Sequence, residues 1–172
     1  EFVKEEIVAR REPGMSAAGG PAPQVIRIKA GKAEPVTDAD GQVWLADQGF
    51  EGGQTIERPE IQIANTRSPD LYRAERYSMD SYKIKVHNGR YTVSLHFAET
   101  FDGILGPGER VFSVSVPGQE VLKDLDLFKT VGPLRPLVKE YKGVSVENGQ
   151  LVIGFTPNIE NPQICGIEIL AE

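Results

Sequence analysis

The stretch Ser81-Tyr-Lys-Ile-Lys-Val-His-Asn-Gly-Arg-Tyr-Thr-Val-Ser-Leu-His-Phe97 decides the fold class, because apolar and polar residues alternate along almost all of it. A period of two is typical of a β-strand that buries one face and exposes the other. In the second half every second side chain is apolar and is expected to face the core, whereas Thr92, Ser94 and His96 are expected to face outward. The stretch therefore predicts two strands of an antiparallel sheet.

Turn signals separate this stretch from its neighbours. Asn88-Gly89 favours a two-residue hairpin, because both central positions of a type I′ turn need positive φ. Asn148-Gly149 is a second such pair. The alternating period recurs in the segments Val25–Lys29, Val111–Val116, Leu151–Phe155 and Cys165–Leu170. Several short strands at this spacing predict an all-β fold in which two antiparallel sheets pack as a β-sandwich, with a barrel as the alternative.

Helix is expected to be scarce. Leu122–Lys129 has the pattern of a single helical turn, which Gly132-Pro133 would end. Trp44 has apolar neighbours and is expected to pack in the core. Cys165, the single cysteine, alternates with apolar residues and is expected to be a small buried side chain rather than a nucleophile. The fold is therefore expected to rest on its core, without disulfides.

Composition indicates one domain. The chain has 172 residues, a net charge of -6 and no strong cluster of Lys or Arg, which argues against binding to nucleic acid. No apolar run approaches the roughly 20 residues that a membrane helix needs. Residues 1–23 are rich in charge, Gly, Ala and Pro, so we expect a linker or tail there and a β-sandwich domain at 24–172. The charged N-terminus has no signal-peptide pattern, and the linker indicates a module of a multidomain protein.

Four segments carry a family resemblance. They are Leu71-Tyr-Arg-Ala-Glu-Arg-Tyr77, His96-Phe-Ala-Glu-Thr100, Arg110-Val-Phe-Ser-Val114 and Asn161-Pro-Gln-Ile-Cys-Gly166. In this order and at these distances they resemble the malectin-type domain, and the likeness spans residues 25–171. The resemblance implies a jelly-roll β-sandwich, like the galactose-binding domains, that binds carbohydrate and does no chemistry.

The resemblance also implies a glycan site made by loops at one end of the sandwich, where aromatic rings cover the C–H faces of a sugar and acidic groups bind its hydroxyls. The corresponding positions are Gln48, Tyr77, Phe101, Asp102 and Glu160. Tyr77 keeps the aromatic residue of the family motif, Phe101 keeps a ring without a hydroxyl, and Glu160 replaces an aspartate. Gln48 and Asp102 stand where animal members carry aromatic residues. The site is expected to stack less and hydrogen-bond more, so the glucose-capped N-glycan of those members is not assumed.

Each of these residues also has a simpler interpretation. Tyr77 is alternatively a core aromatic with its hydroxyl at the surface, and Phe101 is alternatively a hydrophobic plug beneath its loop. Asp102 and Glu160 are alternatively solvated loop carboxylates. Glu75-Arg76 is expected to form structural ion pairs. The sequence alone leaves these alternatives open.

Catalysis and metal binding find little support. Glu99, Asp102 and Glu160 would need separations of about 5–5.5 or 6.5–9.5 Å to act as a glycoside-hydrolysing pair, and the sequence gives no distances. No Ser/His/Asp set, Cys/His set or phosphate loop is present. Asp38-Ala-Asp-Gly41 resembles part of a calcium loop but lacks the spaced ligands and distal Glu of an EF-hand. We therefore expect no enzyme activity and no cofactor, with a structural calcium as the minor alternative.

The favoured function is a non-catalytic carbohydrate-binding module that accompanies a larger glycoside hydrolase. Its expected partners are an oligo- or polysaccharide and a neighbouring domain of the same polypeptide, and neither nucleic acid nor membrane. The expected location is secreted, periplasmic or on the surface of a bacterium. The alternatives are a structural sandwich without a ligand and an autonomous lectin, and the N-terminal linker disfavours the latter.

Overall fold

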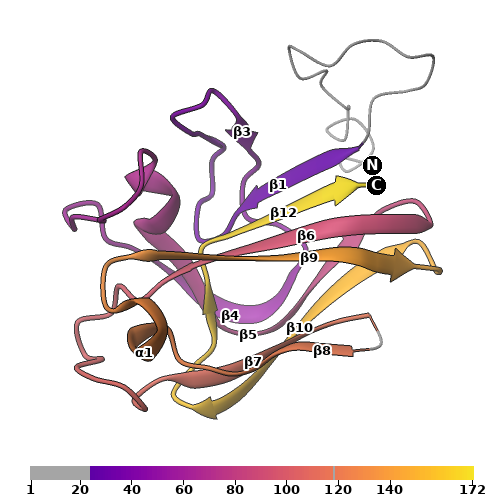
Figure 1. The fold of residues 1–172 in the computed structure, drawn as a ribbon. Helices are drawn as coiled ribbons and strands as arrows, with labels where there is room; N and C mark the ends of the chain where they lie inside the picture. Colours follow the sequence, from indigo (N-terminus) through magenta and orange to yellow (C-terminus); the bar gives the residue numbers. More distant parts are fainter. Residues whose placement is uncertain (1–23, 118) are drawn as a thin grey trace.

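The computed structural model describes residues 24–117 and 119–172, in which two antiparallel β-sheets pack face to face (Figure 1). The four-stranded sheet runs β1 (Val25–Lys29), β12 (Gly166–Ala171), β6 (Gly89–Ala98), β9 (Pro136–Val146). The six-stranded sheet runs β11 (Gln163–Ile164), β5 (Ala74–Lys85), β10 (Gln150–Ile159), β7 (Val111–Val116), β8 (Gln119–Leu125), with β4 (Phe50–Glu57) paired to β5. The remaining elements are β2 (Val36–Thr37), β3 (Val43–Trp44), the 3₁₀ turn η1 (Pro69–Tyr72) and α1 (Leu127–Val131). The predicted linker, residues 1–23, lies outside the described residues.

The core between the sheets consists of the side chains that alternate in the sequence. Val93, Leu95 and Phe97 of β6 are buried, and the Phe97 ring lies 5.9 Å from that of Phe112 on β7, centre to centre. No strand pair joins the two sheets within the described residues, so the barrel alternative is wrong and the β-sandwich is confirmed. No helix in the same part of the chain has the length and apolar character to cross a membrane.

The connection at Asn88-Gly89 is not the predicted hairpin. The strands that flank it, β5 and β6, belong to different sheets, so the chain crosses from one layer to the other. The Gly149 amide donates to Oδ1 of Asn88 at 2.7 Å, which joins this crossing to the one between β9 and β10. Asn-Gly indicates a reversal of the chain, but contacts far from the turn determine which strand each flanking strand pairs with.

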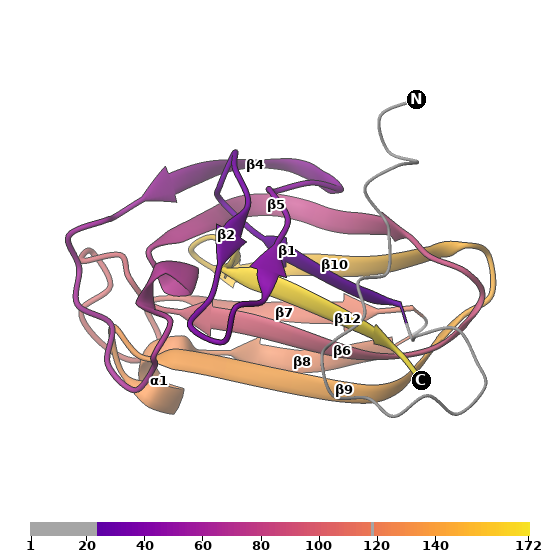
Figure 2. The same ribbon diagram turned by 90° about the horizontal axis from the view of Figure 1, so that it is seen from above.

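The outer face of β6 is half-buried at Thr92 and Ser94 and covered at His96. His96 was expected to face water, yet its side chain is buried, with Nδ1 3.0 Å from the Tyr72 hydroxyl and Nε2 2.8 Å from Oε1 of Glu168. Trp44 meets the His96 ring edge-on at 5.1 Å and is buried, as predicted. Figure 2 shows β2 beside β1 on this side, and its partner strand β3 contacts β1. A second cluster, which includes the buried Cys165, thus caps the four-stranded sheet.

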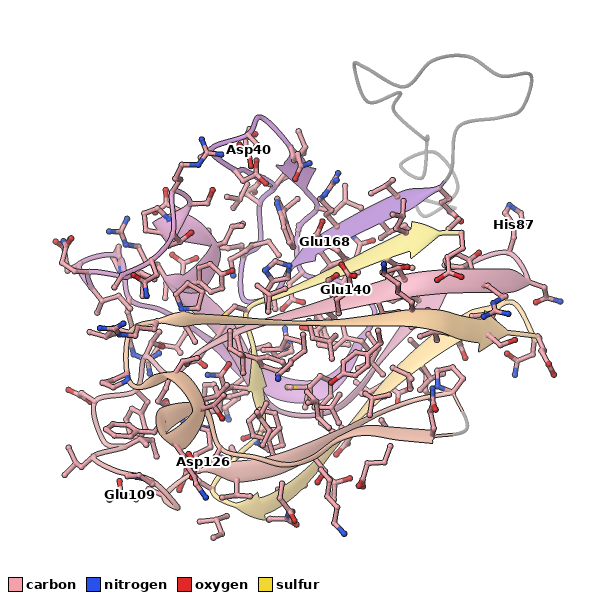
Figure 3. All side chains as sticks on the ribbon, in the orientation of Figure 1. Asp40, His87, Glu109, Asp126, Glu140 and Glu168 are labelled. Atoms are coloured by element: carbon pink, nitrogen blue, oxygen red, sulfur yellow. The ribbon has the colours of Figure 1, made fainter. Side chains whose placement is uncertain are left out.

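The expected helical turn at Leu122–Lys129 is only partly correct. The first half continues β8 to Leu125, and α1 begins two residues later, because Asp126 caps it by accepting from the Lys129 amide at 3.0 Å. The second oxygen of Asp126 accepts from the Gly108 amide at 2.7 Å. Figure 3 shows Asp126 and Glu109 at this α1 end of the sandwich. The cap therefore also holds the loop between β6 and β7.

Lys29 joins three segments inside the molecule. Its side chain is fully buried, and Nζ donates to the carbonyls of Ala30, Ala74 and Cys165 at 2.6, 2.7 and 2.8 Å. Burial lowers the pKa of Lys29 to about 8. Three acceptors for three ammonium protons offset part of that cost. The start of β5, which carries Glu75, is thereby fixed to β1 and to the β11–β12 junction.

Candidate functional site

A cleft of about 170 Å³ lies where loops from both sheets meet. It is lined by Ile56, Arg58, Glu75, Tyr77, Phe101, Arg110, Glu160 and Asn161. These residues come from the end of β4, the start of β5, the two ends of the β6–β7 loop and the loop after β10. The site is therefore assembled from four separate parts of the chain, as expected for loops held on a rigid sandwich.

A second cavity is larger, about 210 Å³, but its chemistry is less suited to a ligand. Its charged side chains pair with each other: Lys32 with Glu57 at 3.0 Å and Arg73 with Asp70 at 2.9 Å. No aromatic residue is among the described residues that line it. The smaller cleft is the candidate site because it combines rings with polar groups that retain bonding capacity.

Two aromatic rings line the cleft. Tyr77 lies on β5 opposite Gln54 of β4, and its hydroxyl donates to Oε1 of Gln54 at 3.0 Å. Phe101 follows β6 and keeps 40% of its surface exposed. A Cβ on Gly103 would lie 2.5 Å from atoms of the Phe101 ring, so glycine is needed for the ring to lie against its own loop. Neither ring is a buried core residue, which excludes the simpler interpretation of Tyr77.

Polar groups form the floor between the rings. Nη1 of Arg58 donates to Oε1 of Glu75 at 2.6 Å and to the Thr100 hydroxyl at 2.9 Å. That hydroxyl donates in turn to Oε1 of Glu75 at 3.2 Å. The Arg58 guanidinium carbon lies 5.8 Å from the centre of the Phe101 ring. Arg58 therefore bridges the acidic floor and one aromatic wall.

Arg110 fixes the loops that carry the site. Its Nε donates to Oε2 of Glu99 at 2.7 Å, and its Nη1 donates to the Asn161 carbonyl. Glu99 also accepts from the Phe101 amide through Oε1 at 3.2 Å. Burial raises the pKa of Glu99, while the Arg110 charge acts against that rise. One buried ion pair thus connects the Phe101 loop with the loop that presents Glu160.

The structure brings three of the five predicted site residues together: Tyr77, Phe101 and Glu160. The other two do not line the cleft. The Gln48 amide bends back to donate to the Ala46 carbonyl at 3.0 Å, and Asp102 is exposed in the turn beyond Phe101. Contact of any of the five with a sugar stays a prediction.

Sequence reasoning missed several lining residues. Glu75 was assigned to structural ion pairs, and Glu75 and Arg76 do form them, with Arg58 and Asp47 respectively. The available signal was spacing, because residues two apart on a strand share a face and Glu75 is two residues before Tyr77. Nothing in the sequence around Arg58 indicates its role, since β4 contacts the site only through its pairing with β5.

The structure brings together neither the three carboxylates considered for glycoside hydrolysis as free groups nor, among the described residues, a group of metal ligands. Glu99 is engaged by Arg110, and Asp102 lies outside the cleft, so Glu160 has neither as a free partner there. Both oxygens of Asp38 accept hydrogen bonds, Oδ1 from two backbone amides and Oδ2 from Nε1 of Trp44 at 3.1 Å. Among residues 24–117 and 119–172, no three His, Cys, Asp or Glu side chains are grouped to hold a metal ion.

Comparison with known proteins adds a family match. The family model described as "Malectin domain" matches residues 24–167. Malectin of Mus musculus is 29% identical over 178 residues, covering 92% of this chain and 60% of that protein. The kinesin-like protein KIN-14E of Oryza sativa subsp. japonica is 36% identical over 129 residues, covering 70% of this chain and 12% of that protein.

Solved structures share the fold. A β-glucuronidase of Bacteroides uniformis matches with a TM-score of 0.79 at 23% identity, covering 86% of this chain and 18% of the enzyme chain. At that identity the likeness concerns the fold alone. The chain spans 12% to 60% of the length of the two relatives above, so it corresponds to one part of each of them.

Proposed function

The chain belongs to the malectin domain family, and from this premise we propose that the cleft between Tyr77 and Phe101 binds part of an oligosaccharide. As a member of this family the domain is non-catalytic. One observation supports the proposal above all: two partly exposed rings line one cleft together with Glu75, whose Oε2 has no hydrogen-bond partner among the described residues. A sugar has the matching distribution, with C–H groups on its faces and hydroxyls around its rim.

The size of the cleft sets the strength of binding. A volume of about 170 Å³ accommodates part of one or two sugar rings rather than a long chain. Each aromatic contact contributes about 0.5–1.5 kcal/mol beyond the buried area. We expect dissociation constants between about 1 μM and 1 mM, which correspond to about -8 to -4 kcal/mol.

The domain is proposed to serve as an accessory module of a larger protein, a glycoside hydrolase in the first instance. The fold forms 18% of the Bacteroides uniformis β-glucuronidase chain, which supports that arrangement without identifying the parent. A secreted, periplasmic or cell-surface location in a bacterium is part of the same proposal, because polysaccharide substrates of such enzymes are met outside the cytoplasm.

The experiment compares two aromatic truncations on a glycan array. Phe101 and Phe50 are both 40% exposed, but Phe50 lies on β4, where its ring packs 3.4 Å from the Arg76 guanidinium carbon, outside the cleft. Phe101→Ala and Tyr77→Ala are expected to abolish retention of the glycans that the wild-type domain binds. Phe50→Ala is expected to retain them.

Thermal unfolding of the same three variants provides the control. Because Tyr77 and Phe101 are not core residues, their truncation is expected to cost well below the about 3–5 kcal/mol typical of a buried aromatic. Wild-type protein that retains no glycan, or cleft variants that bind as the wild type does, would contradict the proposed function.

A further inference from the structure

One carboxylate oxygen in the cleft lacks a partner. Glu75 has a side chain that is 3% exposed, and its Oε1 accepts from Arg58 and Thr100, whereas its Oε2 is buried with no hydrogen-bond partner among the described residues. An unsatisfied charged acceptor lowers the stability of the fold, and buried polar groups without partners are rare in folded proteins. Glu75 is also a lining residue of the cleft. Glu75 therefore brings to the cleft wall an acceptor oxygen that the donors of the described residues leave unused.

A donor with free capacity lies beside it. Arg58 uses Nη1 for Glu75 and Thr100, while its Nε and Nη2 make no hydrogen bond within the described part of the chain. The guanidinium is fixed in position by those bonds and by the Phe101 ring, 5.8 Å away. Acceptor and donor thus stand side by side at the floor. Oε2 is closed to solvent in this structure, so a ligand hydroxyl reaches it only when the side chains over it move.

This pairing suits adjacent hydroxyl groups. One hydroxyl donates to a carboxylate oxygen while its neighbour accepts from a guanidinium N–H, so a pair of vicinal hydroxyls satisfies both groups at once. Ile56, opposite Glu75 in the β4–β5 pairing, adds an apolar contact at the same wall. The geometry requires a ring edge with two hydroxyls directed at the floor and a C–H face against an aromatic side chain.

Charge in the cleft distinguishes between sugar classes. Arg58 is neutralised by Glu75 and Arg110 by Glu99, so the carboxylate of Glu160 is left without an ionic partner among the described residues. A sugar carboxylate would bring a second negative charge to a cleft whose one charge without an ionic partner among the described residues, that of Glu160, is already negative. Like charges brought together on binding weaken that binding. The cleft therefore favours an uncharged sugar.

Building on the proposed glycan-binding function, we infer that Glu75 and Arg58 are the specificity-determining pair, which binds vicinal hydroxyls of a neutral hexose and rejects the matching uronic acid. Glu75 accepts through Oε2 and Arg58 donates through Nε or Nη2. Tyr77 and Phe101 supply stacking that does not distinguish one sugar from another.

The test uses methyl α-glycosides of glucose, galactose and mannose, each beside its uronic acid counterpart. They are titrated to roughly 50 mM, above the millimolar end of the expected affinity range, into ¹⁵N-labelled protein. The signals followed are the Phe101 and Asn161 amides and the Arg58 Nε–H. At least one neutral glycoside is expected to shift all three signals, and its uronic acid is expected to bind at least about tenfold more weakly. Equal or tighter binding of the uronic acid would overturn the inference on the wild-type protein alone.

Glu75→Gln tests the pair itself. The amide oxygen of glutamine can still accept from Arg58 and Thr100, while its NH₂ places a donor where Oε2 stood. Affinity for the neutral glycoside is expected to fall about tenfold, the difference between a hydrogen bond to a charged group and one to a neutral group. Glu57→Gln is the matched control, because Glu57 pairs with Lys32 in the other cavity. It is expected to bind as the wild type does.

The outcomes separate the two proposals. If Glu75→Gln binds the neutral glycoside as the wild type does, the inference is wrong and the glycan site stands. If Glu75→Gln fails to fold, Arg58→Lys replaces it, because this variant keeps the charge beside Glu75 but loses the planar fork of donors. Binding of the neutral glycoside by Arg58→Lys as by the wild type would likewise show that the inference is wrong. Absence of any shift with every glycoside, together with an empty glycan array, would overturn the proposed function as well.

Discussion

Removing Arg110 should destabilise the domain strongly, and the loss should depend on pH. Arg110→Met leaves the Glu99 carboxylate buried without its cation and the Asn161 carbonyl without its donor. Breaking a buried ion pair costs about 3–5 kcal/mol. For a domain of this size each kcal/mol lowers Tm by about 2–4 °C, so a cost of 4 kcal/mol predicts a Tm about 8–16 °C lower.

The pH dependence follows from Glu99. Burial already raises the pKa of this carboxyl, and loss of the Arg110 charge raises it further. A group with a raised folded pKa stabilises the fold below its unfolded pKa and loses that contribution as pH rises through the folded pKa. The deficit of Arg110→Met should therefore be full at pH values above the folded pKa of Glu99 and shrink as pH falls towards the ordinary value of 4.5.

Urea unfolding of wild type and variant, near neutral pH and again in mild acid, measures both effects. Adding Glu99→Gln to Arg110→Met should recover much of the loss at neutral pH, because no buried charge then remains unpaired. Arg90→Met is the control, since that side chain is 70% exposed and lies 3.7 Å from Glu172. A loss below about 1 kcal/mol at neutral pH, or the same loss at both pH values, would refute the assignment of Arg110 as the anchor of the site loops.

Three further predictions concern the framework beneath the site. Gly31→Ala should lower the free energy of urea unfolding clearly more than Gly41→Ala does. Both residues have positive φ, but a Cβ at Gly31 would lie 2.6 Å from the Glu75 amide nitrogen, whereas a Cβ at Gly41 would meet open space. Equal losses in the two variants would contradict the close approach at Gly31. Lys29→Met should lower the unfolding free energy by about 3 kcal/mol or more, because three buried carbonyls lose their donor. The pKa of Lys29 is about 8 in the folded domain and 10.5 ordinarily, so at pH values between these the unfolded chain binds more protons than the folded one. The unfolding free energy of the wild type, relative to that of Lys29→Met, should therefore rise with pH across this interval. A difference that does not change with pH would count against the pKa shift. Cys165 is fully buried and burial raises its pKa to about 12, so a disulfide reagent at pH 8 should modify it only in denaturant; rapid modification of the folded domain would contradict that burial.

The sequence predicts the layers of this fold better than its connections. Alternation along β6 is a local pattern that burial on one face requires, and the structure confirms it. Asn88-Gly89 has the right local chemistry for a hairpin, but whether two flanking strands pair depends on contacts that a dipeptide does not encode. The burial of His96 likewise depends on Trp44 and Tyr72, which come from distant segments.

The sequence likewise predicts only some of the residues that line the cleft. Tyr77, Phe101 and Glu160 could be placed by motif, since each is carried by a recognisable segment. Arg58 could not, because it reaches the cleft only through the β4–β5 pairing, and β4 carries Gly52 and Gly53 instead of an alternating pattern. Long-range strand pairing, rather than residue type, decides which polar groups meet at the floor.

The most direct test of the account is to locate the bound glycan. The oligosaccharide retained best on the array is titrated into ¹⁵N-labelled domain, and the residues whose signals shift are mapped onto the structure. The account predicts shifts centred on Tyr77, Phe101 and Asn161, with Arg58 among them. Shifts centred instead on the second cavity, around Lys32 and Arg73, would contradict the claim that this cleft is the glycan site.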